Sequence, residues 1–357
     1  MGHRLRDAGP LGAALLLAAC GASGSPDALP AAGEPIAGLS PGAWTWVDFP
    51  DSACEDGSPT GIAVNPGSGP DLLLLLNGGG ACWDYFTCEV LGTASRGPFG
   101  RPQFEALAAG ALPGSILDRA LPGNPFADAA LVFVPYCTGD IHGGDRVATY
   151  AGAGGARTWR HVGHANAVAF ARRLAATFPA PRRLVVSGAS AGGFGALLNY
   201  DTFRHYWPAA EGFLLDDSGP PLRRGAVSQT LLDAWYASWG LGRVLDPLCA
   251  AACRGDLSAA LVAVASRHPS DRLALLSSLQ DRVIAGYFLL GPDELQADLL
   301  KLAAEVFDPS PNARYFYVAG SSHTMLASPA AFAQGVTLLD WLGQQVGGDP
   351  AWDSHRP

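Results

Sequence analysis

Residues 184–192, Leu-Val-Val-Ser-Gly-Ala-Ser-Ala-Gly, carry the strongest structural signal in the chain. The apolar residues at the start of this stretch predict a buried strand, and a helix is expected to open directly after it. Between them, residues 188–192 have the pattern G-x-S-x-G. A serine on such a sharp strand-to-helix turn is exposed for attack, and small neighbours let the backbone close. We therefore predict that Ser190 is a nucleophile on this turn, a nucleophile elbow.

The stretch Asn77-Gly78-Gly79-Gly80 directly follows five consecutive leucines, residues 72–76. Five apolar residues without alternation are typical of a strand that is buried on both faces. A serine that attacks a carbonyl needs backbone N–H donors for the negative charge that forms on the oxygen, and glycines let the backbone approach. We therefore expect an oxyanion hole made by the N–H groups of Gly79, Gly80 and Ala191. A phosphate-binding loop would require G-x-x-x-x-G-K-[ST], and this segment has no lysine.

Strand and helix patterns alternate along the chain from about residue 43. An antiparallel pair at a sheet edge is expected first, at residues 43–49 and 61–65. Further strands are expected at residues 72–76, 131–136, 184–187, 213–215, 273–277 and 315–318. Helical periodicity appears at residues 164–178, 195–206, 229–239, 257–266 and 331–342. This order predicts an α/β fold whose mostly parallel sheet has helices on both faces. With the elbow, it predicts an α/β-hydrolase domain over residues 41–350.

The composition excludes several classes of protein. Of the 357 residues, 48% are apolar and 15% charged, so the chain can bury a sizeable core. The formal net charge is −9 and no run of lysines and arginines occurs, which argues against a nucleic-acid-binding protein. Apolar stretches are too short to predict a membrane-spanning helix. We expect a monomer.

The N-terminal residues predict export. Residues 1–19 combine a basic start with a short apolar core, as a signal peptide does. The segment Leu17-Ala18-Ala19-Cys20 resembles the lipoprotein box of bacteria, which implies that Cys20 is lipidated and becomes the mature N-terminus. Gly21 in place of aspartate favours anchoring in the outer membrane. An ordinary cleaved signal with an incidental cysteine is the alternative, and residues 20–40 are expected to form a flexible tether.

The remaining six cysteines are an even number in an exported chain, which predicts disulfides. Two pairs are close in sequence, and the third pair is what remains, giving Cys82–Cys88, Cys249–Cys253 and Cys54–Cys137. No C-x-x-C occurs and the histidines are scattered, so we expect no metal and no cofactor. Asp140, His142 and Asp145 are interpreted as a polar loop that borders the site and not as a metal cluster.

Four segments of the chain are distinctive: residues 76–83 (LNGGGACW), 134–140 (VPYCTGD), 187–193 (SGASAGG) and 197–201 (LLNYD). They resemble the pectin acetylesterase/Notum family of serine carboxylesterases, and a thinner match runs from about residue 43 to 345. Two positions depart from the pattern: Asn77 stands where the family commonly has glutamate, and Ala81 where a bulkier residue is frequent.

The catalytic base is expected after Ser190, because this fold places its triad in the order serine, acid, histidine. Four histidines follow: His205, His268, His323 and His355. His323 comes after the strand expected at residues 315–318, in a loop where a catalytic histidine belongs. The Ser-His segment near the C-terminus of the family matches Ser322-His323. We therefore predict that His323 is the base.

Two aspartates compete for the role of the acid. Asp281 follows the apolar residues 273–278, and the matching segment of the family also ends in a hydrophobic strand and an aspartate. Asp217 ends the strand that follows the elbow helix and is the alternative. We favour Asp281, although an aspartate at the start of a helix can also be a plain helix cap.

The resemblance implies a carboxylesterase that acts on O-acyl esters, chiefly O-acetyl esters on a polysaccharide such as pectin. The Notum branch removes a fatty acyl group, and it shares the same motifs. The net negative charge does not help to attract a polyuronate. A lipoprotein that binds a ligand without catalysis, at the surface of the cell, is the alternative from another class.

Overall fold

The structure is a computed structural model that describes Met1 and residues 29–357. The predicted signal peptide, apart from Met1, and Cys20 lie outside the described residues. Residues 31–357 form one compact unit. Within the described residues, no helix is both long enough and apolar enough to cross a bilayer.

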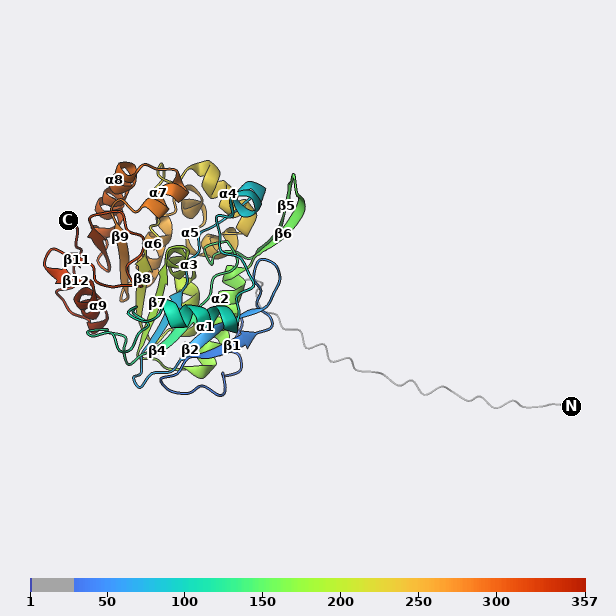
Figure 1. Ribbon diagram of the computed structural model, residues 1–357, viewed down its shortest axis with the longest axis horizontal. Helices are drawn as coiled ribbons and strands as arrows, with labels where there is room; N and C mark the ends of the chain where they lie inside the picture. The colour runs from blue at the N-terminus through green and yellow to red at the C-terminus, as the bar shows by residue number, and fades with distance from the viewer. Residues whose placement is uncertain (2–28) are drawn as a thin grey trace. The chain divides into compact units, whose positions relative to one another are not determined.

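The centre of the unit is a sheet of eight strands in the order β1-β2-β4-β3-β7-β8-β9-β10 (Figure 1). The first two pairings, β1 with β2 and β2 with β4, are antiparallel, and all the others are parallel. This confirms the predicted α/β fold with its antiparallel edge. The strands are β1 (Thr45–Phe49), β2 (Thr60–Asn65), β3 (Leu72–Leu76), β4 (Ala130–Val134), β7 (Arg183–Ala189), β8 (Glu211–Asp217), β9 (Arg272–Ser278) and β10 (Ala313–Val318).

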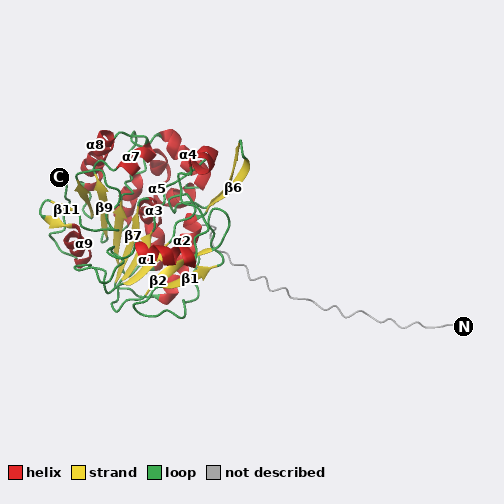
Figure 2. Cartoon of the chain, viewed as in Figure 1, coloured by secondary structure: helices red, strands yellow, loops and turns green. Residues whose placement is uncertain are grey.

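Helices lie on both faces of this sheet (Figure 2). They are α1 (Arg101–Gly110), α2 (Gly163–Thr177), α3 (Ala191–Tyr206), α4 (Gln229–Trp239), α5 (Gly242–Gly255), α6 (Ala259–Arg267), α7 (Arg282–Phe288), α8 (Pro292–Leu302) and α9 (Leu338–Gly347). Two short π-helical segments are η1 (Phe86–Leu91) and η2 (Ala303–Phe307). Two hairpins complete the unit: β5 (Arg146–Gly152) with β6 (Gly155–His161), and β11 (Phe332–Ala333) with β12 (Val336–Thr337).

The leucine run of β3 shows why the sequence produces this layering. Leu72, Leu74 and Leu76 belong to a core that also holds the apolar faces of α2 and α3. Leu73 belongs to the opposite core, which holds Phe104 of α1 and part of α9. Side chains alternate between the two faces of a strand, so a strand with helices on both sides must be apolar at every position.

Residues 31–36, which the sequence analysis places in the tether, lie against α2. The N–H of Gly33 donates to the carbonyl of Arg172 (2.9 Å), and the N–H of Ile36 donates to the hydroxyl of Thr177 (2.8 Å). The side chain of Ile36 is buried in the core beside α2. The segment is thus held by these hydrogen bonds and by the one large apolar residue that it contains.

The six cysteines pair as the sequence predicts, with Cα–Cα distances of 4.9, 5.0 and 5.5 Å for Cys54–Cys137, Cys82–Cys88 and Cys249–Cys253. Cys54–Cys137 joins the loop after β1 to the end of β4, across 83 residues. A bridge of this span typically stabilises a fold by about 2–5 kcal/mol. Cys82–Cys88 lies directly after the glycine-rich segment that follows β3.

Candidate active site

Ser190 occupies the turn between β7 and α3, as predicted. Its backbone has φ 59° and ψ −121°, a conformation that residues other than glycine rarely adopt. The turn needs its glycines: a Cβ on Gly188 would overlap the carbonyl of Gly192, and a Cβ on Gly192 would overlap the carbonyl of Leu76. The N–H of Ser190 donates to the main-chain carbonyl of Asp217 (2.7 Å), which ties the elbow to the neighbouring strand.

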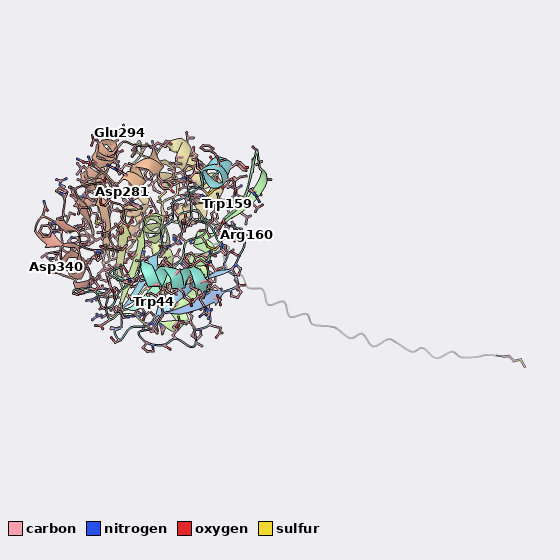
Figure 3. The ribbon with its side chains drawn as sticks, in the orientation of Figure 1. Trp44, Trp159, Arg160, Asp281, Glu294 and Asp340 are labelled. Carbon is pink, nitrogen blue, oxygen red and sulfur yellow. A yellow bond between two sulfur atoms is a disulfide. The ribbon has the colours of Figure 1, made fainter. Side chains whose placement is uncertain are left out.

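The structure brings His323 and Asp281 together. The Nδ1 atom of His323 lies 2.7 Å from Oδ2 of Asp281. Asp281 (Figure 3) is completely buried, and its Oδ1 accepts hydrogen bonds from the N–H groups of Val283 (2.9 Å) and Ile284 (3.1 Å) at the start of α7. A carboxylate can only accept, so the tautomer with hydrogen on Nδ1 fits this contact and leaves Nε2 of His323 free to take a proton.

Asp217, the alternative acid, contacts the loop that carries His323 and makes no hydrogen bond to the imidazole in the described structure. Its Oδ2 accepts the N–H groups of Met325 (2.7 Å) and Leu326 (2.8 Å). Burial raises the pKa of Asp217 to about 6, while these N–H donors and the nearby His323 act to lower it. Of the two candidate aspartates, Asp281 is therefore the one that holds the imidazole.

Ser190, Asp281 and His323 follow β7, β9 and β10 respectively, so all three lie at the carboxyl edge of the parallel sheet. No hydrogen bond joins Ser190 to His323 among the described residues. In enzymes without substrate, catalytic hydrogen bonds are often long and tighten only in the complex.

The glycine-rich segment after β3 is fixed through its carbonyl oxygens. Gly78 packs against the elbow, because a Cβ on it would lie 3.0 Å from the Cβ of Ser190. Each of three carbonyls has a donor: Asn77 O receives His142 Nε2 (2.9 Å), Gly79 O receives the N–H of Ser95 (2.6 Å), and Gly80 O receives the hydroxyl of Tyr136 (2.8 Å).

The N–H groups that the sequence assigns to the oxyanion hole are uncommitted. Within the described part of the chain, those of Gly79, Gly80 and Ala191 donate to no other residue. Ala191 is the first residue of α3, where a helix has unsatisfied N–H groups and a partial positive charge. The glycine-rich segment and the start of α3 thus offer free N–H donors beside Ser190, as an oxyanion hole requires. The carbonyls of the glycine-rich segment are meanwhile held by other donors.

Tyr287 is a site residue that no sequence motif indicates. It lies on α7, and its hydroxyl contacts the carbonyl of Thr93 and accepts the N–H of Ala81 (3.3 Å). Gly80 has φ 74°, and a Cβ there would overlap the hydroxyl of Tyr287. The helix that Asp281 caps therefore also braces the glycine-rich segment. No local pattern could reveal a contact between positions 206 residues apart.

Asp140 and His142 are buried behind the glycine-rich segment. Burial raises the pKa of Asp140 to about 6, and its carboxylate accepts the hydroxyl of Thr138 (2.6 Å) and the N–H of Gly163 (2.7 Å). Burial lowers the pKa of His142 to about 4, so the ring is neutral near pH 7 and can donate to Asn77 O. These residues support the site from behind. The described residues contain no group of three His, Cys, Asp or Glu that could hold a metal ion.

A small apolar pocket of about 20 Å³ adjoins Ser190. A cavity needs about 10–15 Å³ to hold one water molecule, so this pocket admits only a very small group as it stands. Its far wall is aromatic, with ring centroids 6.1 Å apart for Trp235 and Phe288 and 6.2 Å apart for Phe194 and Phe288. The lining residues are Gly80, Ala81, Ile141, Ser190, Ala191, Phe194, Trp235, Ile284, Tyr287 and Phe288.

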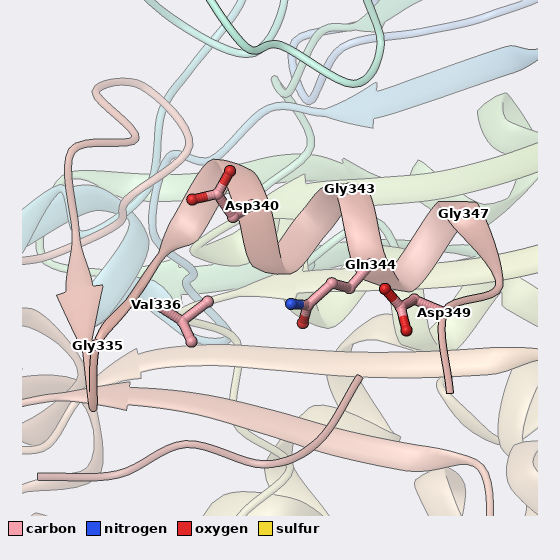
Figure 4. Close-up of a pocket in the computed structure, with 7 residues that line it drawn as sticks. All are labelled: Gly335, Val336, Asp340, Gly343, Gln344, Gly347 and Asp349. Atoms are coloured by element: carbon pink, nitrogen blue, oxygen red, sulfur yellow. The ribbon is translucent and has the colours of Figure 1, made fainter. Parts of the chain in front are cut away.

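A larger groove of about 580 Å³ lies along α9 (Figure 4). Its lining is polar and glycine-rich, with Asp340, Gln344 and Asp349 among the side chains. None of the predicted catalytic residues lines it. Of the two cavities, only the small pocket is lined by the predicted nucleophile, Ser190.

A model of the family described as Pectinacetylesterase matches residues 45–231, just over half of the chain. The matched region includes the glycine-rich segment and Ser190 and ends before Asp281 and His323. A search of curated proteins found no match. The eight-stranded sheet with its helices has the α/β-hydrolase architecture of this family, whose members are carboxylic ester hydrolases. On the match and the fold together, the chain belongs to the pectinacetylesterase family.

Proposed function

We propose that this chain hydrolyses short O-acyl esters, chiefly O-acetyl esters carried on a saccharide, with Ser190, His323 and Asp281 as its triad. The observation that carries the proposal is the position of Ser190, between uncommitted N–H donors and a small apolar pocket. The family description, which names an acetylesterase of pectin, supports an acetylated saccharide as the substrate class.

In the first half of the reaction, the Oγ of Ser190 attacks the ester carbonyl, while Nε2 of His323 takes the hydroxyl proton. The imidazolium that forms is stabilised by the carboxylate of Asp281 at Nδ1. Collapse of the tetrahedral intermediate breaks the bond to the alcohol oxygen, which receives the proton from His323. Ser190 is left acylated.

In the second half, a water molecule gives a proton to His323 and attacks the acyl carbon, and the acid leaves as Ser190 recovers its proton. Both tetrahedral intermediates carry an oxyanion, which the N–H groups of Gly79, Gly80 and Ala191 stabilise. Loss of one such donor typically lowers the rate by about 10²–10³-fold.

The alternative activity, removal of a fatty acyl group, requires room for a long chain. The pocket of about 20 Å³, which Trp235 and Phe288 help to line, favours an acetyl group instead. In this proposal, a longer chain has to displace one of these rings. The size of the acyl group is therefore the property on which the two activities differ.

Hydrolysis of p-nitrophenyl esters with acyl chains of two, four and eight carbons tests this assignment. We expect the highest kcat/KM for the acetate, with a decrease of about 10-fold or more per step, because each longer chain must displace an aromatic wall in a close-packed interior. A kcat/KM that rises with chain length would favour the fatty-acyl activity. No hydrolysis of any ester, together with no labelling by a fluorophosphonate, would favour a binding protein.

Phe288→Ala provides the matching variant for this prediction. Removing the ring should open the pocket and shift the preference to the four-carbon ester, while activity on the acetate falls. Leu289→Ala is the control, because Leu289 is the next residue and its side chain is 92% exposed. An unchanged profile in Phe288→Ala would show that this ring does not set the acyl length.

We also propose that the chain is exported and held at the outer membrane through a lipid on Cys20, with residues 1–19 removed. The residues that support this lie outside the described part of the structure. Cys20→Ser should abolish incorporation of a fatty-acid analogue in growing cells, because the thiol that carries the lipid is gone. Equal labelling of the wild type and the variant would contradict the anchor.

A further inference from the structure

Asp217 and Ser218 occupy the end of β8, the strand between the one that leads to Ser190 and the one that leads to Asp281. Asp217 pairs with Ala189 of β7 on one side and with Leu276 of β9 on the other. Its main-chain carbonyl accepts the N–H of Ser190 (2.7 Å). The dipeptide is therefore fixed relative to the nucleophile through the backbone alone.

The side chains of the same two residues bind the loop that carries His323. The hydroxyl of Ser218 accepts the N–H of Thr324 (3.2 Å), and the carboxylate of Asp217 accepts those of Met325 (2.7 Å) and Leu326 (2.8 Å). Both Asp217 and Ser218 are completely buried. Three consecutive N–H groups directly after His323 are thus held by one dipeptide at the end of β8.

The backbone conformation shows that this hold is needed. Thr324 has φ 63° and Ser218 has φ 62°, in the left-handed region that residues other than glycine seldom enter. Such conformations persist only when the surrounding structure imposes them. Thr324 directly follows His323, so the acceptors on Asp217 and Ser218 fix the backbone next to the histidine.

We propose that Asp217 and Ser218 act as a clamp that sets the position of His323 relative to Ser190, whereas Asp281 sets the orientation of the ring. The proposal rests on the proposed function, in which His323 takes the proton of Ser190. No direct hydrogen bond joins these two residues among those described, so their alignment depends on the backbone links that the clamp supplies. Asp217 and Ser218 are positioning residues and touch no substrate.

The charge on Asp217 contributes to the clamp. Burial raises the pKa of Asp217 to about 6, so the carboxylate is ionised in an assay at about pH 8. Hydrogen bonds to an ionised acceptor are roughly twice as strong as those between neutral groups. An asparagine in place of Asp217 would keep one acceptor oxygen but lose the charge, and the main-chain bond to Ser190 would remain.

Asp217→Asn tests the clamp on p-nitrophenyl acetate. We expect kcat to fall by about 10–100-fold, because a misplacement of about 1 Å can cost that much, with KM changed by less than about threefold. In a His323→Ala background, the same substitution should change the residual rate by less than about twofold, because the clamp acts through His323. A purely structural defect would lower both rates alike.

Ser218→Ala is the second variant and removes only the acceptor for Thr324. We expect kcat to fall by about 3–10-fold with KM unchanged, and again with no effect in the His323→Ala background. Ser187→Ala is the matched control: Ser187 is a buried serine of β7 whose hydroxyl has no partner in the described structure. It should retain the kcat of the wild type.

The outcomes separate the clamp from the proposed function. Wild-type kcat in both Asp217→Asn and Ser218→Ala would overturn the clamp, as would equal losses with and without His323. If Asp217→Asn does not fold, as judged by circular dichroism, Ser218→Ala decides alone by the same two criteria. A wild type that hydrolyses no ester would instead reject the proposed function before the variants are compared.

Discussion

Ser190→Ala is expected to lower kcat for p-nitrophenyl acetate by about 10⁵–10⁶-fold, the loss typical when the nucleophile of a serine hydrolase is removed. The residual rate would come from the uncommitted N–H groups of Gly79, Gly80 and Ala191 and from binding alone. The fold should survive, because the main-chain bond from residue 190 to Asp217 does not involve the hydroxyl.

The same variant should lose all labelling by a fluorophosphonate, which reacts with an activated serine. Ser322→Ala is a suitable control, because Ser322 is an exposed serine next to His323. It should keep both labelling and most of kcat. Labelling that persists in Ser190→Ala but disappears in another serine variant would place the nucleophile elsewhere.

The parts of the site that the sequence predicted have local causes. The elbow is visible because Gly188 and Gly192 must be glycine for the turn to close, whatever the rest of the fold does. The glycine-rich segment after β3 can be recognised for the same reason, because the backbone at Gly80 also requires glycine. The pairing of the cysteines follows because two pairs are close in sequence and the even number leaves one further pair. Backbone requirements of this kind leave a pattern in a few consecutive residues.

The parts that the sequence did not predict are made by contacts between distant positions. Tyr287 joins α7 to the segment after β3, and the clamp at Asp217 joins β8 to the loop of His323. The sequence predicts that Asp140 and His142 border the site, but it does not indicate the contact of His142 with Asn77. Nothing in the neighbourhood of Asp217 indicates that its carboxylate binds backbone N–H groups more than 100 residues later. Such roles arise only when the sheet brings the strand ends together.

The helices and strands also divide into those that the local sequence pattern predicts and those that it does not. The strand at residues 72–76 and the helix at residues 229–239 have the predicted bounds. The helix expected at residues 331–342 begins only at Leu338, because Gln334 and Gly335 have positive φ and form the turn of the β11–β12 hairpin. The hairpin β5–β6, which projects from the unit in Figure 1, was not predicted, because its strands are largely exposed and lack an apolar run.

Asp281→Asn is expected to cause the second large loss of kcat. The hydrogen bonds of Asp281 give a specific reason for this loss. Oδ1 of Asp281 accepts two N–H groups at the start of α7, and Oδ2 faces Nδ1 of His323. In asparagine, the single oxygen must stay with the N–H groups of Val283 and Ile284, because an amide NH₂ cannot accept from them. The NH₂ group then faces His323 and donates to Nδ1.

This arrangement forces the hydrogen of a neutral imidazole onto Nε2, the atom that must accept the proton of Ser190. We therefore expect kcat to fall by about 10⁴-fold with little change in KM, as occurs when the tautomer of a triad histidine is reversed. Asparagine is the right replacement because it is as good an N-cap as aspartate, so α7 and its contact through Tyr287 should persist. Alanine would remove the cap as well and mix two effects.

The measurement that decides the identity of the acid is kcat for Asp281→Asn beside Asp217→Asn, after circular dichroism has shown that both are folded. If Asp281 orients His323 and Asp217 only positions its loop, the first loss should exceed the second by about 100-fold or more, since one reverses the tautomer and the other weakens two backbone contacts. A nearly wild-type Asp281→Asn beside an inactive Asp217→Asn would make Asp217 the acid. Comparable losses in both would mean that the two carboxylates share the charge of the imidazolium, and that position and orientation of His323 are not set separately.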